Sequence, residues 1–191
     1  MQEILKRTIA GLLMAAALAG LLTGTGGHFS VLYLALAGFI GLAILGDFKD
    51  LKKRFSLKWY GLGLLMALGV LSITGALNYF FNHHATANPT AGANIGILAM
   101  LITEIIPSLI GEELMTLIFY KVFGGGALGV VASTLIFAAA HGPEYHWNPL
   151  QLVSLVAIRL VFSYILIKKG VQTAAALHIT YDSLIILPTM L

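Results

Sequence analysis

The stretch LIGEELMTLIF, residues 109–119, places two adjacent carboxylates, Glu112 and Glu113, inside an otherwise apolar run. At the centre of a membrane-spanning helix a carboxylate costs about 2.5–3.5 kcal/mol on the insertion scale, and such residues usually face the interior of a helix bundle and have a function. If the chain lies in a membrane, the pair indicates either a polar seam between helices or a functional site.

The composition indicates a membrane protein. Of the 191 residues, 59% are hydrophobic and only 10% are charged, and the mean hydropathy is +0.93, whereas soluble domains carry about 25% charged residues. The length predicts a single integral-membrane domain over residues 1–191, with the lipid bilayer as its surroundings. The formal net charge of +3 is too small to favour a nucleic-acid partner. The sequence contains no cysteine, which excludes disulfides, a thiol nucleophile and a cysteine metal site.

The apolar runs predict an all-α fold, a polytopic bundle of about seven transmembrane helices. A helix needs about 20 apolar residues to cross the hydrocarbon layer. The glycines of GLGLLMALG, residues 61–69, favour close helix packing in lipid. The expected spans are residues 9–23, 29–46, 59–81, 95–119, 127–140, 149–167 and 171–191, of which the fifth is short for a full crossing.

The basic residues predict a cytoplasmic N-terminus and an outer C-terminus. With seven spans and the N-terminus inside, every basic loop and helix end falls on the cytoplasmic side, as the positive-inside rule requires. The first 20 residues also have the pattern of a signal peptide, but the later spans and the consistent charge pattern favour an uncleaved first helix. The basic residues concerned are Lys6, Arg7, Lys49, Lys52, Lys53, Arg54, Lys58, Lys121, Lys168 and Lys169.

Two other expected spans carry polar residues at helical spacing. FAAAH ends the fifth span at His141, and HITYD in the seventh places His178 and Asp182 four residues apart, on one helix face. The helical rise puts Glu112 and His178 at similar depths and the other two groups somewhat deeper, so we expect the four to meet in one cavity. In the fourth span, one polar stripe is formed by Glu104, Ser108, Glu112 and Thr116.

Such a cavity is suited to hydrolysis. A carboxylate with a histidine can hold and deprotonate a water molecule for attack on a carbonyl, and neighbouring donors can stabilise the resulting oxyanion. The same residue types can equally hold a divalent metal such as zinc, whose bound water is the nucleophile. The residues by themselves leave these two routes open.

Taken in order, the three motifs resemble those of the CAAX prenyl protease and bacteriocin-processing family, also called the CPBP or Abi family. These polytopic intramembrane endopeptidases carry Glu-Glu-x-x-x-Arg, Phe-x-x-x-His and His-x-x-x-Asn/Asp, and the resemblance covers about residues 95–191. It implies that Glu112 activates water with His141 as its partner, and that His178 and Asp182 stabilise the oxyanion. It further implies a bacterial membrane enzyme that cleaves a membrane-associated peptide or protein in bacteriocin maturation or self-immunity.

The first motif is incomplete in this chain. Leu117 stands where the family has arginine, four residues after Glu113, and a buried carboxylate needs a partner to stay ionised. The only charged residue within the expected span 149–167 is Arg159. We therefore predict that Arg159 pairs with Glu113 from another helix; the alternative is that its side chain snorkels to the membrane surface.

Two further functional classes compete with the protease. Leu117 favours a non-catalytic membrane scaffold or immunity protein of the same fold. Intramembrane carboxylates also suit a proton- or cation-coupled transporter, but transporters often contain inverted repeats, and the sequence has no internal repeat. Beyond His141, the aromatic residues Tyr145 and Trp147 are expected to anchor the chain at the membrane interface.

Overall fold

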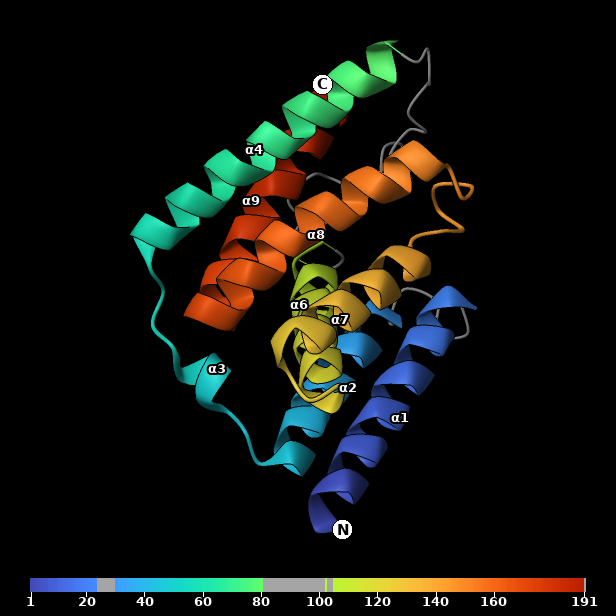
Figure 1. Cartoon of the computed structure of the whole chain (residues 1–191), viewed down its shortest axis with the longest axis vertical. Helices are drawn as coiled ribbons and strands as arrows, with labels where there is room; N and C mark the ends of the chain where they lie inside the picture. The colour runs from blue at the N-terminus through green and yellow to red at the C-terminus, as the bar shows by residue number, and fades with distance from the viewer. Residues whose placement is uncertain (24–29, 81–101, 103–104, 191) are drawn as a thin grey trace.

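The chain folds into a helical bundle, shown in Figure 1. A computed structural model describes residues 1–23, 30–80, 102 and 105–190, and the regular secondary structure of these residues is helical. The all-α prediction is thereby confirmed. The helices are α1 (Gln2–Leu22), α2 (Ser30–Leu45), α3 (Lys49–Lys52), α4 (Leu57–Phe80), α6 (Ile106–Val122), α7 (Gly126–Ala140), α8 (Pro149–Lys169) and α9 (Val171–Met190).

The seven longer helices correspond to the seven expected spans. By length and apolar composition, three of the described helices can cross a membrane: Gln2–Leu22, Leu57–Leu77 and Pro149–Lys169. Two shorter helices, Leu32–Leu45 and Gly126–Ala140, are also apolar. Most of the first part of the expected span 95–119, including Glu104 of the polar stripe, lies outside the described residues. The helical membrane bundle is thus supported, while the number of complete crossings stays a prediction.

The boundaries of α8 follow from its terminal residues. Pro149 is the first residue of the helix, where its missing N–H is not needed. Before it, the Asn148 side chain caps the helix by accepting hydrogen bonds from the N–H groups of Leu150 and Gln151. At the other end Gly170 has a φ of +81°, a conformation that favours glycine. The chain therefore leaves α8 sharply and enters α9, which packs against it.

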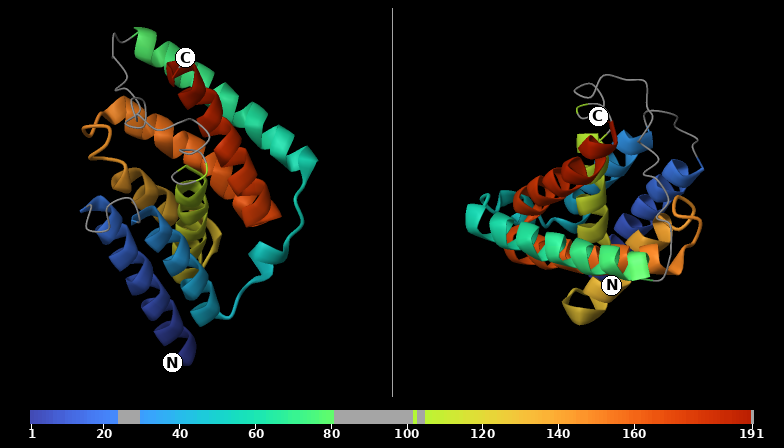
Figure 2. Two further views of the ribbon diagram at one scale, coloured as in Figure 1. Left: turned by 180° about the vertical axis from the view of Figure 1, so that it is seen from behind. Right: turned by 90° about the horizontal axis from the view of Figure 1, so that it is seen from above.

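Helix α6, which carries the glutamate pair, lies at the centre of the bundle. It packs against α1, α2, α7, α8 and α9, whereas α4 packs on the outer side of α8 and α9. Two directions of view show α6 between the α1–α2 pair and the α4, α8 and α9 group (Figure 2). This position buries most of its side chains, among them Leu114, Leu117 and Ile118.

Glycines allow some of these helices to approach closely. A Cβ atom on Gly63 of α4 would lie 2.6 Å from Cδ2 of Leu177, and one on Gly38 of α2 would clash with Leu114 of α6. Gly61 and Gly69, by contrast, have nothing within 4 Å of that position. The expected role of the 61–69 glycines in packing therefore applies to Gly63 alone among these three.

A cluster of charged side chains, the Lys121 cluster, ties the α2–α4 connection to the bundle. We define it as Asp47, Asp50, Lys53 and Lys121. Lys121 Nζ lies 2.6 Å from Asp47 Oδ2 and 2.8 Å from Asp50 Oδ2, and Lys53 Nζ donates to the Ile167 carbonyl oxygen at 2.7 Å. Burial alone would raise the pKa of Asp50, but hydrogen bonds from Lys121 and Lys53 outweigh it and lower that pKa below its usual value.

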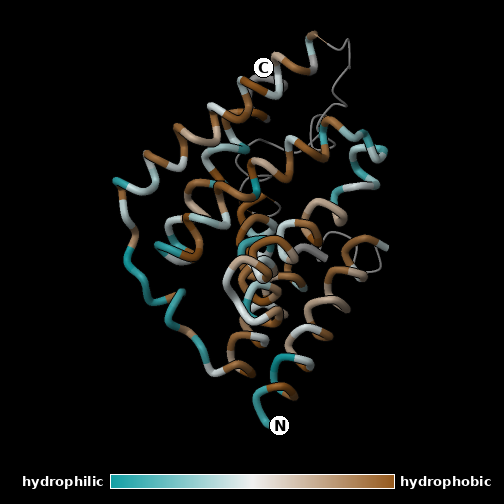
Figure 3. Tube along the Cα trace, in the orientation of Figure 1, coloured by the Kyte–Doolittle hydropathy of each residue, from teal (hydrophilic) through white to brown (hydrophobic). Residues whose placement is uncertain are grey.

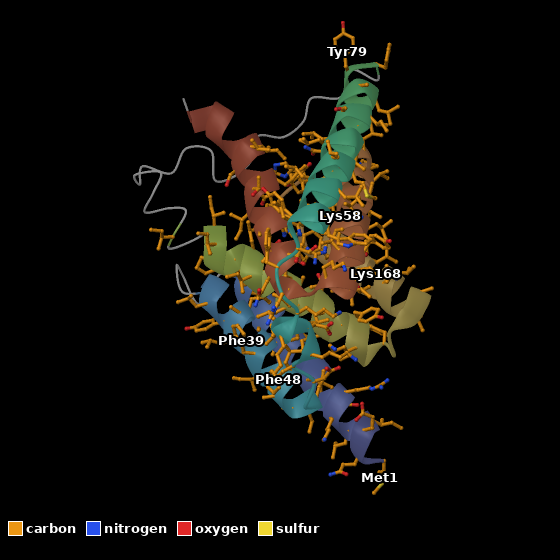
Figure 4. All side chains as sticks on the ribbon, turned by 90° about the vertical axis from the view of Figure 1, so that its left-hand side faces the viewer. Met1, Phe39, Phe48, Lys58, Tyr79 and Lys168 are labelled. Carbon is orange, nitrogen blue, oxygen red and sulfur yellow. The ribbon has the colours of Figure 1, made fainter. Side chains whose placement is uncertain are left out.

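The Lys121 cluster brings several helix ends together. Figure 3 shows hydrophilic residues concentrated along α3 and the segment that leads into α4. In Figure 4, Lys58 at the start of α4 and Lys168 near the end of α8 lie at mid-height, between Tyr79 at the other end of α4 and Met1. The alternation of the spans across a membrane stays a prediction.

Candidate active site

A buried ion pair joins the glutamate motif to α8. Arg159 Nη1 lies 2.7 Å from Glu113 Oε1 and Nη2 lies 3.1 Å from Oε2, and both side chains are 0% exposed. Two parallel N–H···O bonds are the strongest geometry for this pair. The guanidinium also lies 4.5 Å from the centre of the Phe137 ring. The predicted pairing is present and Arg159 does not snorkel, while Leu117 is buried in the apolar core.

Glu113 in turn orients His178 of α9. His178 Nδ1 lies 2.9 Å from Glu113 Oε1. A carboxylate bound to arginine is an acceptor, so Nδ1 carries the proton and donates it. The opposite nitrogen, Nε2, lies 3.8 Å from Glu112 Oε2 and 3.8 Å from Asp182 Oδ1. Packing against Phe162, with ring centres 4.6 Å apart, also restrains the imidazole.

Glu112 points in a different direction from its neighbour. Successive residues of an α-helix are rotated by about 100° around the helix axis. When Glu113 faces the core, Glu112 therefore faces a different and less buried side of α6. Its side chain is 12% exposed and accepts a hydrogen bond of 3.3 Å from Ser108 Oγ. Thr116 Oγ1 donates to the Glu112 backbone carbonyl at 2.9 Å. The described part of the expected stripe therefore lies along one face.

His141 ends α7 and is held by its own helix. Its Nδ1 lies 2.9 Å from the Phe137 carbonyl oxygen, which can only accept, so Nδ1 is the protonated nitrogen. Nε2 is then free to accept a proton and lies 3.9 Å from Glu144 Oε2. In the described residues, the histidine that contacts Glu112 is His178 and not His141. Glu112 and His141 line the same cavity, and their expected partnership stays a prediction.

The candidate residues line one cavity of about 900 Å³. Its polar wall contains Glu112, His141, Arg159, His178 and Asp182. The groups are therefore brought together as expected. The remaining wall is largely apolar and includes Leu18, Leu21, Leu34, Leu71, Leu155 and Ile185.

The sequence analysis missed two residues at this cavity. Glu144 and Tyr145, in the turn between α7 and α8, both line it. Burial, with the nearby carboxylates of Glu144, Asp182 and Glu112, raises the pKa of Tyr145 to about 12. Tyr145 thus faces the cavity, whereas the expectation placed it at the membrane interface. The three-residue spacing from His141 to Glu144, which suits a helical turn, was the available signal.

The side chains present do not form a metal-ligand set. No group of three or more His, Asp or Glu residues that could hold a metal ion occurs in the part of the chain that the structure describes. One ring nitrogen of each histidine donates to another group, to Glu113 for His178 and to the Phe137 carbonyl for His141, so Nε2 of each ring is the nitrogen that can accept a proton.

The comparisons with known proteins bear on the same half of the chain. Residues 93–184 match the family model for type II CAAX prenyl endopeptidases, Rce1-like. The match supports the CAAX protease family for this segment of the chain. No curated protein and no solved structure matches the chain.

The matched segment contains all the candidate residues. It includes α6, α7 and α8 and extends into α9, so each side chain of the polar wall falls within it. This match, with the apolar helices, points to an integral membrane protein of the CAAX protease type. The role of each residue stays a prediction, since the family match by itself assigns none.

Proposed function

We propose that this CAAX-type protein is an intramembrane endopeptidase that hydrolyses a peptide bond in a membrane-associated protein or peptide. One observation carries the proposal: the Glu113–Arg159 pair holds His178 so that its Nε2 faces both Glu112 and Asp182 in the cavity. A buried ion pair that orients a histidine toward two carboxylates is costly to maintain, and active sites are where such arrangements concentrate.

The proposed reaction begins at Glu112. Its carboxylate takes a proton from a water molecule, and the hydroxide oxygen forms a bond to the scissile carbonyl carbon. The oxyanion that develops accepts hydrogen bonds on the His178 and Asp182 side of the cavity, from a protonated Nε2 or a protonated carboxyl group. The proton on Glu112 then passes to the amide nitrogen, the C–N bond breaks, and an acid and an amine leave.

The contact between Arg159 and Glu113 weakens the case for the competing function, a non-catalytic scaffold. The strongest argument for a non-catalytic protein was that Leu117 replaces the family's arginine. Since Arg159 supplies two hydrogen bonds to Glu113 from α8, that carboxylate does not lack a cationic partner. We therefore favour the protease. A bacterial cell membrane, with bacteriocin maturation or self-immunity as the process, is the setting that the resemblance implies, and it forms part of this proposal.

The test compares cells that carry the native chain with cells that carry Glu112→Gln at matched expression. New peptide termini in the membrane and secreted fractions are mapped by mass spectrometry. Loss of a general base typically lowers the rate by about 10²–10⁴-fold, so we expect termini that depend on the native chain to disappear with the variant. Glu3→Gln is the matched control, because Glu3 pairs with Arg7 on the surface of α1, outside the cavity.

Unchanged peptide termini would contradict the protease proposal. If native and Glu112→Gln cells have identical termini, and any immunity phenotype survives the substitution, the protease proposal is wrong. The non-catalytic scaffold would then be the better description.

A further inference from the structure

The turn between α7 and α8 has an unusual backbone. His146 and Trp147 have φ values of +49° and +56°, in the left-handed region that residues other than glycine rarely adopt. Such residues persist only where their surroundings hold them, and such strain clusters at functional sites. Backbone hydrogen bonds hold the turn, among them those from Tyr145 N to His141 O at 3.1 Å and from Trp147 N to Gly142 O at 2.8 Å.

The Trp147 ring closes the turn against Gly142. A Cβ atom on Gly142 would lie 2.5 Å from the ring atoms Cη2 and Cζ3 of Trp147, so only glycine permits this contact. The backbone strain and the ring contact together define one conformation. In that conformation Glu144, at the tip of the turn, lies beside the cavity.

Glu144 faces the reactive nitrogen of His141. The Glu144 side chain is 44% exposed, and its Oε2 lies 3.9 Å from His141 Nε2. Because Nδ1 donates to the Phe137 carbonyl, Nε2 is the nitrogen that gains a proton when the ring becomes charged. A carboxylate at this place attracts the charged ring.

The other charged and titratable groups around the cavity have further partners, although Asp182 also interacts electrostatically with His141 and the Tyr145 ring stacks on it. Arg159 is bonded to Glu113, and both Glu112 and Asp182 face His178. The groups that line the cavity come from α6, α8, α9 and the turn: Glu112, Arg159, His178, Tyr181, Asp182, Glu144 and Tyr145.

We propose that Glu144 is a positioning residue for His141, which holds the imidazole toward the cavity and stabilises its protonated form during the reaction. The inference rests on the proposed function. Partial burial raises the pKa of Glu144, the nearby His141 lowers it, and Glu112 raises it, which agrees with direct electrostatic contact between the turn and the cavity.

The experiment uses the full-length chain in lipid nanodiscs, with Glu144→Gln, Glu144→Asp and the control Glu3→Gln. The first readout is the ¹⁵N chemical shift of the His141 ring nitrogens at one fixed pH, measured by NMR with ¹⁵N-labelled histidine. We expect Glu144→Gln to move the Nε2 signal, because the carboxylate beside that nitrogen is removed, and Glu144→Asp to move it less.

The second readout is cleavage of the substrate found with the native chain. We expect Glu144→Gln to lower kcat about fivefold, the factor that corresponds to the interaction of two unit charges about 4 Å apart in a water-like dielectric, with little change in KM and a displaced pH–rate profile. Glu144→Asp should restore part of the rate. A structural role alone would lower the melting temperature without displacing the pH profile.

The outcomes separate the two proposals. If the native chain cleaves nothing, the proposed function fails and the catalytic part of the Glu144 proposal fails with it. If the native chain is active but Glu144→Gln keeps both the native pH–rate profile and the native ¹⁵N signals of His141, only the Glu144 proposal is overturned.

Discussion

Arg159 supplies from α8 the cation that Glu113 does not find within α6. The family motif that the sequence resembles has arginine four residues after the second glutamate, where this chain has Leu117. A carboxylate is satisfied by any guanidinium that reaches it in the right plane, and Arg159 does so with bonds of 2.7 and 3.1 Å. The Glu113–Arg159 pair therefore joins α6 to α8.

The first prediction at the residue scale moves the arginine of the ion pair from position 159 to position 117. Arg159→Leu should destabilise the protein by about 3–5 kcal/mol, because it leaves Glu113 as a buried carboxylate without a cation. Leu117→Arg alone should also destabilise it, by placing a second cation in the core. We expect the double variant to melt at a higher temperature than Arg159→Leu in detergent, since it rebuilds the pair from within α6.

A second double variant is the control for this exchange. Glu113→Leu with Arg159→Leu removes both charges and should be more stable than either single change, yet inactive because His178 loses its acceptor. If neither double variant is more stable than its single parents, the ion pair does not contribute as its geometry indicates.

At the scale of the helix, α6 separates its two glutamates by rotation. Glu113 is directed to the ion pair and Glu112 to the cavity, because neighbouring residues differ by about 100° around the axis. A two-residue motif on one helix therefore serves two functions, one structural and one proposed to be chemical. The central position of α6 in the bundle makes both possible.

The Lys121 cluster predicts how stability depends on pH. The folded-state pKa values of Asp47 and Asp50 lie below the ordinary one: burial raises each, but the contacts with Lys121 and other lysines outweigh it. Their contribution is therefore complete above about pH 4, the unfolded value, and is lost as the pH falls through the folded-state values. We expect the melting temperature of the native protein in detergent to decrease when the pH is lowered below about 4.

Substitutions locate this effect in the cluster. Asp50→Asn should weaken the acid dependence, and Lys121→Met should cost about 3 kcal/mol at neutral pH, because it leaves the buried Asp50 short of a cation. Glu3→Gln, on the surface of α1, should leave the acid dependence nearly native. An unchanged acid dependence in Asp50→Asn would show that other carboxylates cause it.

At the scale of the whole molecule, two ends of the bundle carry different groups. The Lys121 cluster joins the α2–α4 connection to the ends of α6 and α8. The turn that carries Glu144 leads from the end of α7 to the start of α8, and α8 ends at the Lys121 cluster. From the positive-inside rule we predict that the first group lies in the cytoplasm and the turn outside.

Single introduced cysteines test this topology, because the native sequence contains none. We expect Lys52→Cys and Lys168→Cys to react with an impermeant maleimide only after cells are opened. Trp147→Cys, at a position that is 59% exposed, should react in intact cells. Labelling of Lys52→Cys and Trp147→Cys from the same side would contradict the predicted crossing pattern.

Most of the candidate site was predictable because its residues carry local signals. Glu112, His141, His178 and Asp182 are polar groups in apolar helices, where each has a cost that a function must justify. Arg159 was predictable as the partner of Glu113 because a buried carboxylate needs a cation and the sequence offers few within the spans. Glu144 carried no such signal, since a carboxylate in a polar turn is ordinary.

The sequence by itself determined the helical class, the approximate spans and the residues that meet in the cavity, because hydropathy and helical spacing are properties of short segments. Only the tertiary structure decided which groups touch: that His178 and not His141 contacts Glu112, that Nδ1 of His178 faces Glu113, and that Glu144 faces His141. The physical reason is that helix rotation and the path of a turn are set by packing among α6, α7, α8 and α9. A rotation of a few tens of degrees, which changes no local signal, is enough to exchange one partner for another.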